Sequence, residues 1–248
     1  MTYEKSLWRE KFTKLSFMFE GKQAIVVLPE KPYGRWMLKT EYFDAFQDFE
    51  CELVNRGYTL AYLQNGSRLV KEGDLERKKR FADFLINEFN LADKCVPVGM
   101  SCGGLHAIRQ ASAYPEMISV LCLDAPVVNL LSWPFHMSDR TTFCSEGAEK
   151  EVFDALGLTR TTILTYRDHP FDHIPDLLKA KIPMLLTYGD ADEEVPFSEN
   201  GILLAEAYDK TDIPHLVMGT PGRGHHPHGP NGDIAMQRAI EFVLRYDK

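Results

Sequence analysis

The clearest chemical signal in the sequence lies at residues 99–104, which read Gly-Met-Ser-Cys-Gly-Gly. They follow an apolar run at 95–98 and open a helix-like segment, which predicts a sharp strand-to-helix turn with Ser101 at its tip. Glycines suit such a turn because their missing Cβ atoms leave room where the chain packs against itself. A serine exposed in this way can act as a nucleophile, and the backbone N–H of Cys102 can face a developing oxyanion.

Carboxylates that could serve this serine follow a later buried strand. The apolar run at 183–188 predicts that strand, and the loop at 189–196 comes directly after it. The acidic residues of the loop are Asp190, Asp192, Glu193 and Glu194. A carboxylate at this place can orient a histidine, which in turn takes the proton of the serine.

Histidines occupy the next loop along the chain. A short apolar run at 215–218 is followed by a Gly- and Pro-rich segment at 219–229, which contains His225, His226 and His228. Because the carboxyl ends of parallel strands meet at one edge of a sheet, the serine, the carboxylates and the imidazoles are expected to come together there. Their order along the chain indicates catalysis by a nucleophilic serine.

The same histidines, together with His215, raise the alternative of a metal site. Adjacent histidines on a tight turn are expected to point apart, and no cysteine or carboxylate joins them at the spacing of metal ligands. The glycines at 222 and 224 also lack the Lys-Ser/Thr end of a phosphate-binding loop. We therefore predict no catalytic metal and no cofactor.

Apolar periodicity predicts alternating strands and helices around these loops. Strands are expected at 15–20, 23–28, 58–63, 95–98, 118–123, 183–188 and 215–218, the first two as an antiparallel hairpin. Helices are expected at 40–56, 74–89, 100–113, 198–210 and 233–246. This alternation predicts the α/β class, with a mostly parallel sheet covered by helices on both faces. The length fits a single domain over residues 1–248.

One long excursion, at residues 129–180, interrupts the alternation. It leaves the sheet at the edge where the serine is expected, which predicts a small lid over the site. The residues expected to bind substrate there are Trp133, Phe135, His169, Phe171 and Asp172. The alternative is a surface insertion that does not touch substrate.

Composition limits the class of partner. The formal net charge of −8 argues against nucleic acid and against an anionic membrane surface. The first residues lack the apolar core of a signal peptide, and no later run is long enough to span a bilayer, so we expect a cytoplasmic protein. The five cysteines show no metal-type spacing, and we expect reduced thiols.

Taken together, the motifs resemble the α/β-hydrolase superfamily over nearly the whole chain. The resemblance rests on the serine motif at 99–104, on Gly-x-x-Asp-x-x-Val-Pro at 189–196, and on Gly-His-His-Pro-His at 224–228. More narrowly, the chain is similar to bacterial esterase-like hydrolases related to prolyl oligopeptidases and acetyl esterases, many of them linked with polysaccharide breakdown. These share a segment like 36–43 and a Ser-Trp-Pro like that at 132–134, although their usual arginine is Lys39 here.

The resemblance implies a role for each matching residue. It places the nucleophile at Ser101, the acid at Asp192 and the base at His225, with Asp124 as the alternative acid, His226 as the alternative base and His228 as a structural residue. The oxyanion would be held by the Cys102 N–H and by a second amide from segment 29–36, which we assign to Trp36.

The implied activity is that of a serine hydrolase that cleaves small or medium carboxylic esters, carbohydrate esters among them, through an acyl-enzyme. The expected partner is thus a small-molecule ester. Two alternatives are a peptidase or amidase that uses the same residues and a noncatalytic binding protein that retains the fold.

Overall fold

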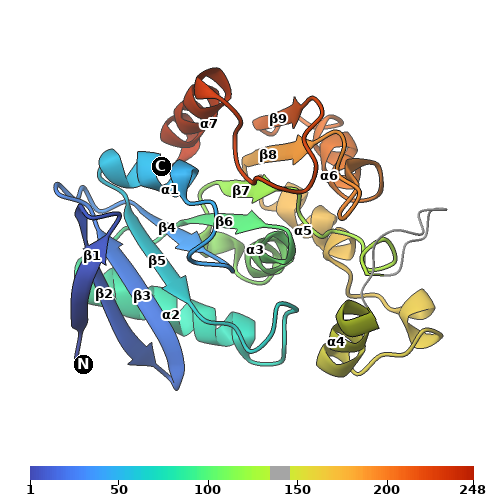
Figure 1. Ribbon diagram of the computed structural model, residues 1–248, viewed down its shortest axis with the longest axis horizontal. Helices are drawn as coiled ribbons and strands as arrows, with labels where there is room; N and C mark the ends of the chain where they lie inside the picture. Colours follow the sequence, from blue (N-terminus) through green and yellow to red (C-terminus); the bar gives the residue numbers. More distant parts are fainter. Residues whose placement is uncertain (135–145) are drawn as a thin grey trace.

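A nine-stranded sheet forms the centre of the molecule, with the strand order β1-β2-β3-β5-β4-β6-β7-β8-β9 (Figure 1). The computed structural model describes residues 1–134 and 146–248. Its strands are β1 (Glu4–Trp8), β2 (Phe12–Phe19), β3 (Lys22–Leu28), β4 (Trp36–Lys39), β5 (Thr59–Leu63), β6 (Val96–Met100), β7 (Leu121–Asp124), β8 (Met184–Gly189) and β9 (His215–Thr220). Strands β1, β2, β3 and β5 pair antiparallel, and every pair from β5 through β4 to β9 is parallel.

Helices cover both faces of the sheet (Figure 1). They are α1 (Asp48–Asn55), α2 (Asp74–Phe89), α3 (Cys102–Ala113), α4 (Glu146–Leu156), α5 (Ile174–Lys179), α6 (Gly201–Tyr208) and α7 (Asp233–Tyr246), with short 3₁₀ helices at Pro115–Met117, Thr162–Thr165, Pro170–His173 and Phe197–Glu199. One core cluster joins the sheet to α2, α3, α5 and α6, and a second joins it to α1 and α7. Side chains alternate between the two, so Val26 of β3 enters the first cluster and Val27 the second. Burial on both faces explains why the strands read as apolar runs.

The predicted α/β class and the mostly parallel sheet are confirmed, but the segment before α1 was predicted wrongly. Residues 36–39 form the buried strand β4, which was not predicted, and the helix expected from residue 40 begins only at Asp48. Tyr42 and Phe46 adopt positive φ angles of 53° and 47°, which a helix does not allow. Their loop runs along the carboxyl edge of the sheet, beside Ser101.

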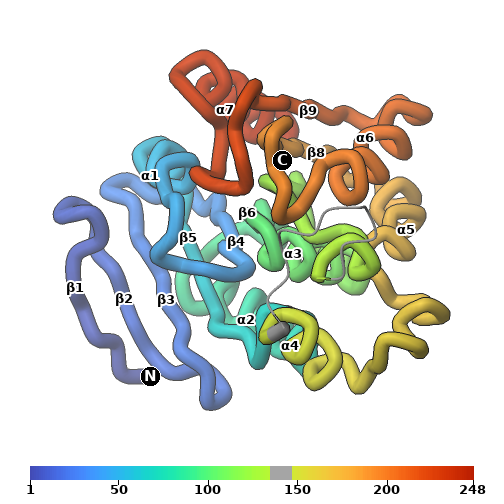
Figure 2. Tube along the Cα trace, turned by 45° about the vertical axis from the view of Figure 1, so that its right-hand side comes forward, coloured from blue at the N-terminus to red at the C-terminus, as the bar shows by residue number. Residues whose placement is uncertain are grey.

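A third apolar cluster packs α4 against the carboxyl edge of the sheet. It includes Leu69, Cys102, Trp133 and Val152. Figure 2 shows the chain after α4 looping away from the sheet before it returns as α5. Helix α5 packs into the main core through buried Ile174 and Leu177, so the last part of the predicted excursion belongs to the helical layer. The lid itself stays a prediction.

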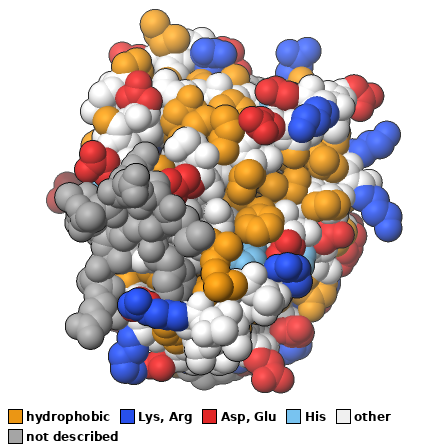
Figure 3. All heavy atoms as spheres, turned by 90° about the vertical axis from the view of Figure 1, so that its right-hand side faces the viewer, with side chains coloured by type: hydrophobic (Ala, Val, Ile, Leu, Met, Phe, Trp, Pro, Cys, Tyr) orange, Lys and Arg blue, Asp and Glu red, His pale blue; other side chains and the backbone are white. Residues whose placement is uncertain are grey.

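Charges of both signs are interspersed on the surface. On the face that Figure 3 shows, acidic and basic side chains lie among hydrophobic ones. Lys79 pairs with Asp83 at 2.6 Å and Arg80 with Glu20 at 2.6 Å, which are exposed contacts of the kind that stabilises a fold little. Within residues 1–134 and 146–248, no helix is long and apolar enough to cross a membrane.

Candidate active site

Ser101 lies at the tip of the turn between β6 and α3, in a backbone conformation that few non-glycine residues adopt. Its φ and ψ angles are 53° and −124°. Its N–H donates to the carbonyl oxygen of Asp124 at 3.0 Å, which ties the turn to the end of β7. A Cβ atom on Gly99 would lie 2.4 Å from the carbonyl oxygen of Gly103, so only glycine fits there. The strained turn therefore presents the hydroxyl at the edge of the sheet.

Ser101, His225 and Asp192 form a continuous chain of hydrogen bonds. The Ser101 Oγ lies 3.0 Å from Nε2 of His225, and Nδ1 of the same ring lies 2.8 Å from Oδ2 of Asp192. The side chains of His225 and Asp192 are only 4% and 1% exposed. With Asp192 ionised, Nδ1–H is the donor, so the lone pair on Nε2 can accept the serine proton.

The acid loop explains why Asp192, among its carboxylates, contacts His225. Oδ1 of Asp192 accepts hydrogen bonds from the N–H groups of Glu194 and Val195, both at 2.9 Å, and this leaves Oδ2 for the imidazole. Asp190 instead accepts from the N–H of Gly222 at 2.6 Å and so fastens the histidine loop to the acid loop. The acid loop at 189–196 and the histidine loop at 219–229 therefore lie in close contact.

Asp124, the alternative acid, binds His228 rather than His225. It accepts from Nδ1 of His228 at 2.5 Å, from Nη2 of Arg223 at 2.8 Å and from the hydroxyl of Thr187. Burial by itself would raise the pKa of Asp124, but the hydrogen bond and charge of His228, with Arg223 and Thr187, bring that pKa below its ordinary value. Arg223 and His228 flank His225 in the chain, so this buried network holds the histidine loop on both sides of the ring that contacts Ser101.

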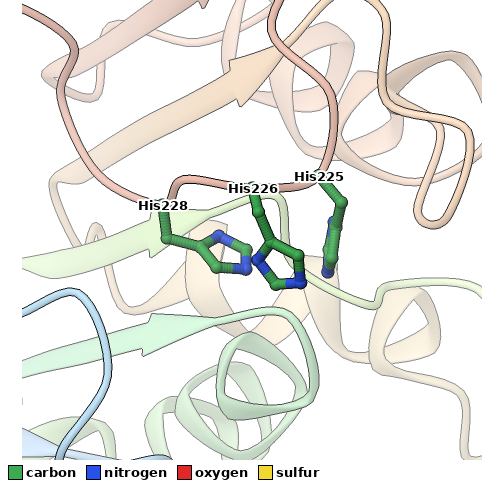
Figure 4. A group of neighbouring side chains, drawn as sticks. All are labelled: His225, His226 and His228. Atoms are coloured by element: carbon green, nitrogen blue, oxygen red, sulfur yellow. The ribbon is translucent and has the colours of Figure 1, made fainter.

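The three histidines of this loop gather at one place. Each of His225, His226 and His228 has a ring nitrogen within 4.8 Å of one in the others, and Figure 4 shows the three rings side by side. The expectation that adjacent histidines point apart is wrong, because all three side chains extend to the same side of the loop (Figure 4). His226 is exposed and stacks on Phe46 with ring centroids 5.4 Å apart. In the described part of the chain, this is the group that could hold a metal ion.

The backbone N–H of Cys102 is the first of α3, where amide hydrogens have no partner inside the helix. It directly follows Ser101, as an oxyanion donor must in this kind of turn. The thiol of Cys102 is buried, and burial raises its pKa to about 12. The thiol therefore stays protonated near neutral pH and is a poor nucleophile.

Trp36 lies too far from Ser101 to supply the second amide, so this prediction is corrected. It begins β4 and pairs with Thr59, and its neighbour Met37 pairs with Val96 at the start of β6. Ser101 follows the other end of β6, roughly 15–20 Å along the strand direction. The error follows from the unpredicted strand β4, because the loop before that strand was taken for the loop after it.

The segment that reaches the serine turn is the one after β4. The Thr40 hydroxyl donates to the carbonyl oxygen of Gly103 at 2.7 Å, and Glu41 lies so close to Gly103 that a Cβ added there would be 3.2 Å from the Glu41 Cβ. Tyr42 comes next and lines the cavity beside Ser101. An amide of residues 41–42 is thus the nearest candidate for a second oxyanion donor.

A cavity of about 290 Å³ opens beside Ser101 and the histidines. Its walls include Tyr42, Phe46, Arg68, Trp133 and Glu194. The guanidinium of Arg68 binds the carboxylate of Glu151 on α4 and lies 5.8 Å from the centre of the Trp133 ring. Of these residues, only Trp133 was predicted to contact substrate. Tyr42 and Phe46 were hidden by their assignment to a helix.

Three other residues predicted to bind substrate lie away from this cavity. His169 is 1% exposed, stacks on Phe171 at 4.8 Å, and accepts through Nδ1 from the N–H of Leu130. Asp172 accepts from the N–H of His169 at 3.0 Å. These three residues pack the base of the excursion and do not line the cavity beside Ser101, while Phe135 lies outside the described residues.

Lys39, which the resemblance matched to an arginine, does not line the cavity beside Ser101. Its Nζ lies 2.5 Å from Oε1 of Glu50 and donates to the carbonyl oxygen of Ala45 at 2.9 Å. Both members of the ion pair are 2% exposed. The pair holds the loop between β4 and α1 against α1, so the role of Lys39 is structural.

A second buried lysine, Lys78 of α2, contacts the segment after β4. Nζ of Lys78 donates to the carbonyl oxygen of Thr40 at 3.3 Å and lies 3.1 Å from Nδ1 of His106. Asn65 also donates to the Thr40 carbonyl, at 2.7 Å. Burial lowers the pKa of Lys78 to about 8, although Glu41 and Asp74 oppose the shift.

This lysine predicts a pH dependence of stability. Between pH 8 and the ordinary lysine pKa of 10.5, the unfolded chain keeps a proton that the folded Lys78 has lost, so stability rises with pH. Relative to Lys78→Met, the wild-type free energy of unfolding should increase by about 3 kcal/mol across this range. Urea unfolding of both proteins at several pH values measures the difference. Parallel curves for the two proteins would contradict the lowered pKa.

Trp133 is expected to influence which acyl chains fit. Trp133→Ala enlarges the cavity, so the ratio of kcat/KM between long and short acyl esters should change by about tenfold or more. Phe171→Ala is the control, because Phe171 packs on His169 outside the cavity and should lower the melting temperature at constant preference. A uniform loss on all esters in Trp133→Ala, with a lower melting temperature, would mean that this tryptophan only packs the fold.

The model of the prolyl oligopeptidase family matches residues 55–247, which hold Ser101, Asp192 and His225. Among curated proteins, none matches the sequence.

Solved structures share the fold at low sequence identity. An S-formylglutathione hydrolase from Agrobacterium tumefaciens superposes with a TM-score of 0.68 at 14% identity, over 100% of both chains. Dipeptidyl peptidase 4 from Porphyromonas gingivalis gives a TM-score of 0.68 at 16% identity, over 95% of this chain and 35% of that one. A puromycin hydrolase gives 0.69 at 17% identity, over 98% of this chain and 39% of that one. The chain thus spans little more than a third of the last two.

Proposed function

Because the chain belongs to the prolyl oligopeptidase family, within the α/β-hydrolase superfamily, and is a serine hydrolase, we propose that it cleaves small or medium carboxylic esters through an acyl-enzyme on Ser101. The observation that carries the proposal is the hydrogen-bonded chain from the Ser101 hydroxyl through both nitrogens of His225 to the Asp192 carboxylate. This arrangement has the parts that acyl transfer requires: a nucleophile, a base, and a buried acid that orients the base.

The proposed reaction has two halves. His225 Nε2 takes the proton of Ser101 as the hydroxyl oxygen attacks the ester carbonyl, and the resulting imidazolium is stabilised by Asp192. The N–H of Cys102 and an amide of residues 41–42 hold the negative oxygen. His225 then returns the proton to the leaving alcohol, and water repeats the sequence on the acyl-enzyme to release the acid.

The cavity walls support a substrate of modest size. Phe46 and Trp133 offer aromatic surface, and the volume of about 290 Å³ lies near the lower end for pockets that enclose small molecules. We place the acyl or alcohol group of the ester against these walls. An ester also suits the site because an alcohol is a better leaving group than an amine and depends less on its protonation.

Cleavage of a peptide or amide bond is the second candidate. Membership of the prolyl oligopeptidase family favours it, and so does Glu194, whose carboxylate in the cavity wall would attract the free amino group of such a substrate. An amide would require His225 to protonate the departing amine before the tetrahedral intermediate collapses.

Hydrolysis assays can separate the two candidates. Kinetics would be measured on 4-nitrophenyl esters of increasing acyl length, acetylated sugars, and 4-nitroanilides of single amino acids. The proposal expects kcat/KM for short esters to exceed that for the anilides by orders of magnitude. A preference for anilides with a free amino group, lost in Glu194→Gln, would instead establish the peptidase alternative.

A further inference from the structure

The three histidines beside Ser101 form a group with more ligating capacity than ester hydrolysis uses. We propose that His225, His226 and His228, named here the histidine cluster, bind one divalent transition-metal ion of the zinc class, and that this ion inhibits the enzyme. Binding is a property of the cluster alone. The inhibition rests on the proposed function, because it requires His225 to be the base.

The composition and position of the cluster favour such an ion. Neutral imidazole is a preferred ligand of zinc, copper and nickel, and sites with three histidines and an open fourth position are known for zinc. The three residues lie within four positions of one loop, and their ligating nitrogens lie within 4.8 Å of one another. The ring centroids of the three pairs lie 4.6, 4.9 and 5.0 Å apart, so the rings form a compact triangle (Figure 4). The cluster also lines the open cavity, which gives an ion a path of entry.

The carboxylates behind the cluster form the outer shell that such a site needs. A histidine that binds a metal usually donates its other ring N–H to a carboxylate, which fixes the ring and makes the ligating nitrogen more basic. His225 has this arrangement with Asp192 at 2.8 Å, and His228 has it with Asp124 at 2.5 Å. In both rings Nδ1 is occupied in this way, which leaves the Nε2 lone pair for an ion.

The outer shell is itself rigid. Asp192 is held by the backbone N–H groups of Glu194 and Val195, and Asp124 by Arg223 and the hydroxyl of Thr187. Two ligands are therefore oriented in advance. Zinc–nitrogen bonds of about 2.0–2.1 Å require the nitrogens to approach more closely than 4.8 Å. The exposed ring of His226, which stacks on Phe46, is the member with room to move.

Occupancy of the cluster has a direct consequence for catalysis. The Nε2 atom of His225 lies 3.0 Å from the Ser101 Oγ and has one lone pair. When that lone pair binds a metal ion, it cannot accept the serine proton, so the ion and the first step of hydrolysis compete for the same atom. The fourth position on the ion would face Ser101 and the cavity, where water or the hydroxyl can complete a tetrahedral site.

The experiment uses zinc chloride and the full chain. Equilibrium dialysis would measure zinc bound per chain in wild type, Ser101→Ala, His226→Asn and His215→Asn. We expect one zinc per chain in wild type and in Ser101→Ala, and an affinity at least about tenfold lower in His226→Asn, since even the loss of an outer-shell partner costs that much. His215→Asn is the matched control, because His215 lies on β9 and pairs with Asp209 away from the cluster, and its affinity should match wild type.

Two results would overturn the zinc site, and a third would overturn the inhibition alone. Absence of stoichiometric zinc in wild type, or equal affinity in His226→Asn and His215→Asn, would overturn the site. Zinc that binds with the expected dependence on His226 but leaves ester hydrolysis unchanged would overturn the inhibition and would count against His225 as the base. Loss of hydrolysis that follows zinc occupancy, with full recovery after addition of a chelator, is the expected result.

Discussion

Replacing Ser101 with alanine is expected to reduce ester turnover on the order of 10⁶-fold, the scale on which loss of a nucleophilic serine acts. The change removes the one oxygen that His225 can activate, while Gly99 and the Asp124 contact that shape the turn remain. The fold should therefore survive, and circular dichroism and a thermal melt would verify this. The measurement is kcat on a short 4-nitrophenyl ester for both proteins.

The neighbouring residue provides the control for this prediction. Cys102→Ala should retain much of the activity, because the proposed contribution of Cys102 comes from its backbone N–H and its buried thiol has a pKa of about 12. Full activity in Ser101→Ala would remove this serine from the mechanism. Near-total loss in Cys102→Ala would show that the thiol has a role that this structure does not explain.

Asp192→Asn is expected to lower kcat by about 10⁴-fold. The amide has nearly the same shape, and it can still accept the N–H groups of Glu194 and Val195 through its oxygen. It then turns its NH₂ toward His225 Nδ1, which favours the wrong tautomer and leaves the imidazolium without a counter-charge. Steady-state kinetics and a melting curve of the variant measure the two effects.

Two further carboxylates serve as controls for the acid. Asp190→Asn should have a far smaller effect, because Asp190 accepts the N–H of Gly222, whereas the carboxylate that contacts His225 is that of Asp192. Asp124→Asn should weaken the network around Arg223 and His228 and lower stability more than kcat. If Asp124→Asn were the variant that loses activity by four orders of magnitude while Asp192→Asn stayed active, the acid would be on the earlier strand.

The sequence indicated the hydrogen-bonded group of Ser101, His225 and Asp192 better than its surroundings, and the reason is physical. The turn at Ser101 and the Asp192 loop need glycines at fixed offsets, because a Cβ on Gly99 or Gly189 would collide with neighbouring backbone at 2.4 Å or 2.1 Å. Such constraints are local and leave a pattern of residue types. The helices α2 and α7 were also predicted with the bounds that the structure shows, since long amphipathic repeats are the strongest signal of a helix.

The second oxyanion donor and the cavity walls could not be found in the same way. Strand β4 has four residues, all buried, and carries no alternating pattern to distinguish it from a loop or from the start of a helix. Because β4 was not predicted, the oxyanion loop was expected in the segment before this strand instead of in the segment after it. Residues such as Arg68 and Glu194 enter the cavity wall through tertiary packing, which no local spacing encodes.

The role of Asp124 was predicted only in part. The resemblance implied Asp124 as the alternative acid, and the structure places its carboxylate in the histidine loop network. Its partner is His228, which the resemblance had treated as structural, and the bond between the two satisfies side chains that are only 9% and 3% exposed. The choice between His225 and His226 depended on which ring reaches Asp192, and only the three-dimensional path of the loop decides that contact.

The role of Ser101 as the nucleophile is tested most directly by identifying the residue that an active-site serine probe modifies. Wild-type protein would be treated with a fluorophosphonate, digested and mapped by mass spectrometry, with His225→Ala and His226→Ala treated in parallel. We predict a single adduct on Ser101 that forms rapidly in wild type, slows by orders of magnitude in His225→Ala, and forms at a rate close to wild type in His226→Ala. An adduct on another residue would contradict Ser101 as the nucleophile, and labelling of Ser101 that does not depend on His225 would contradict His225 as its base.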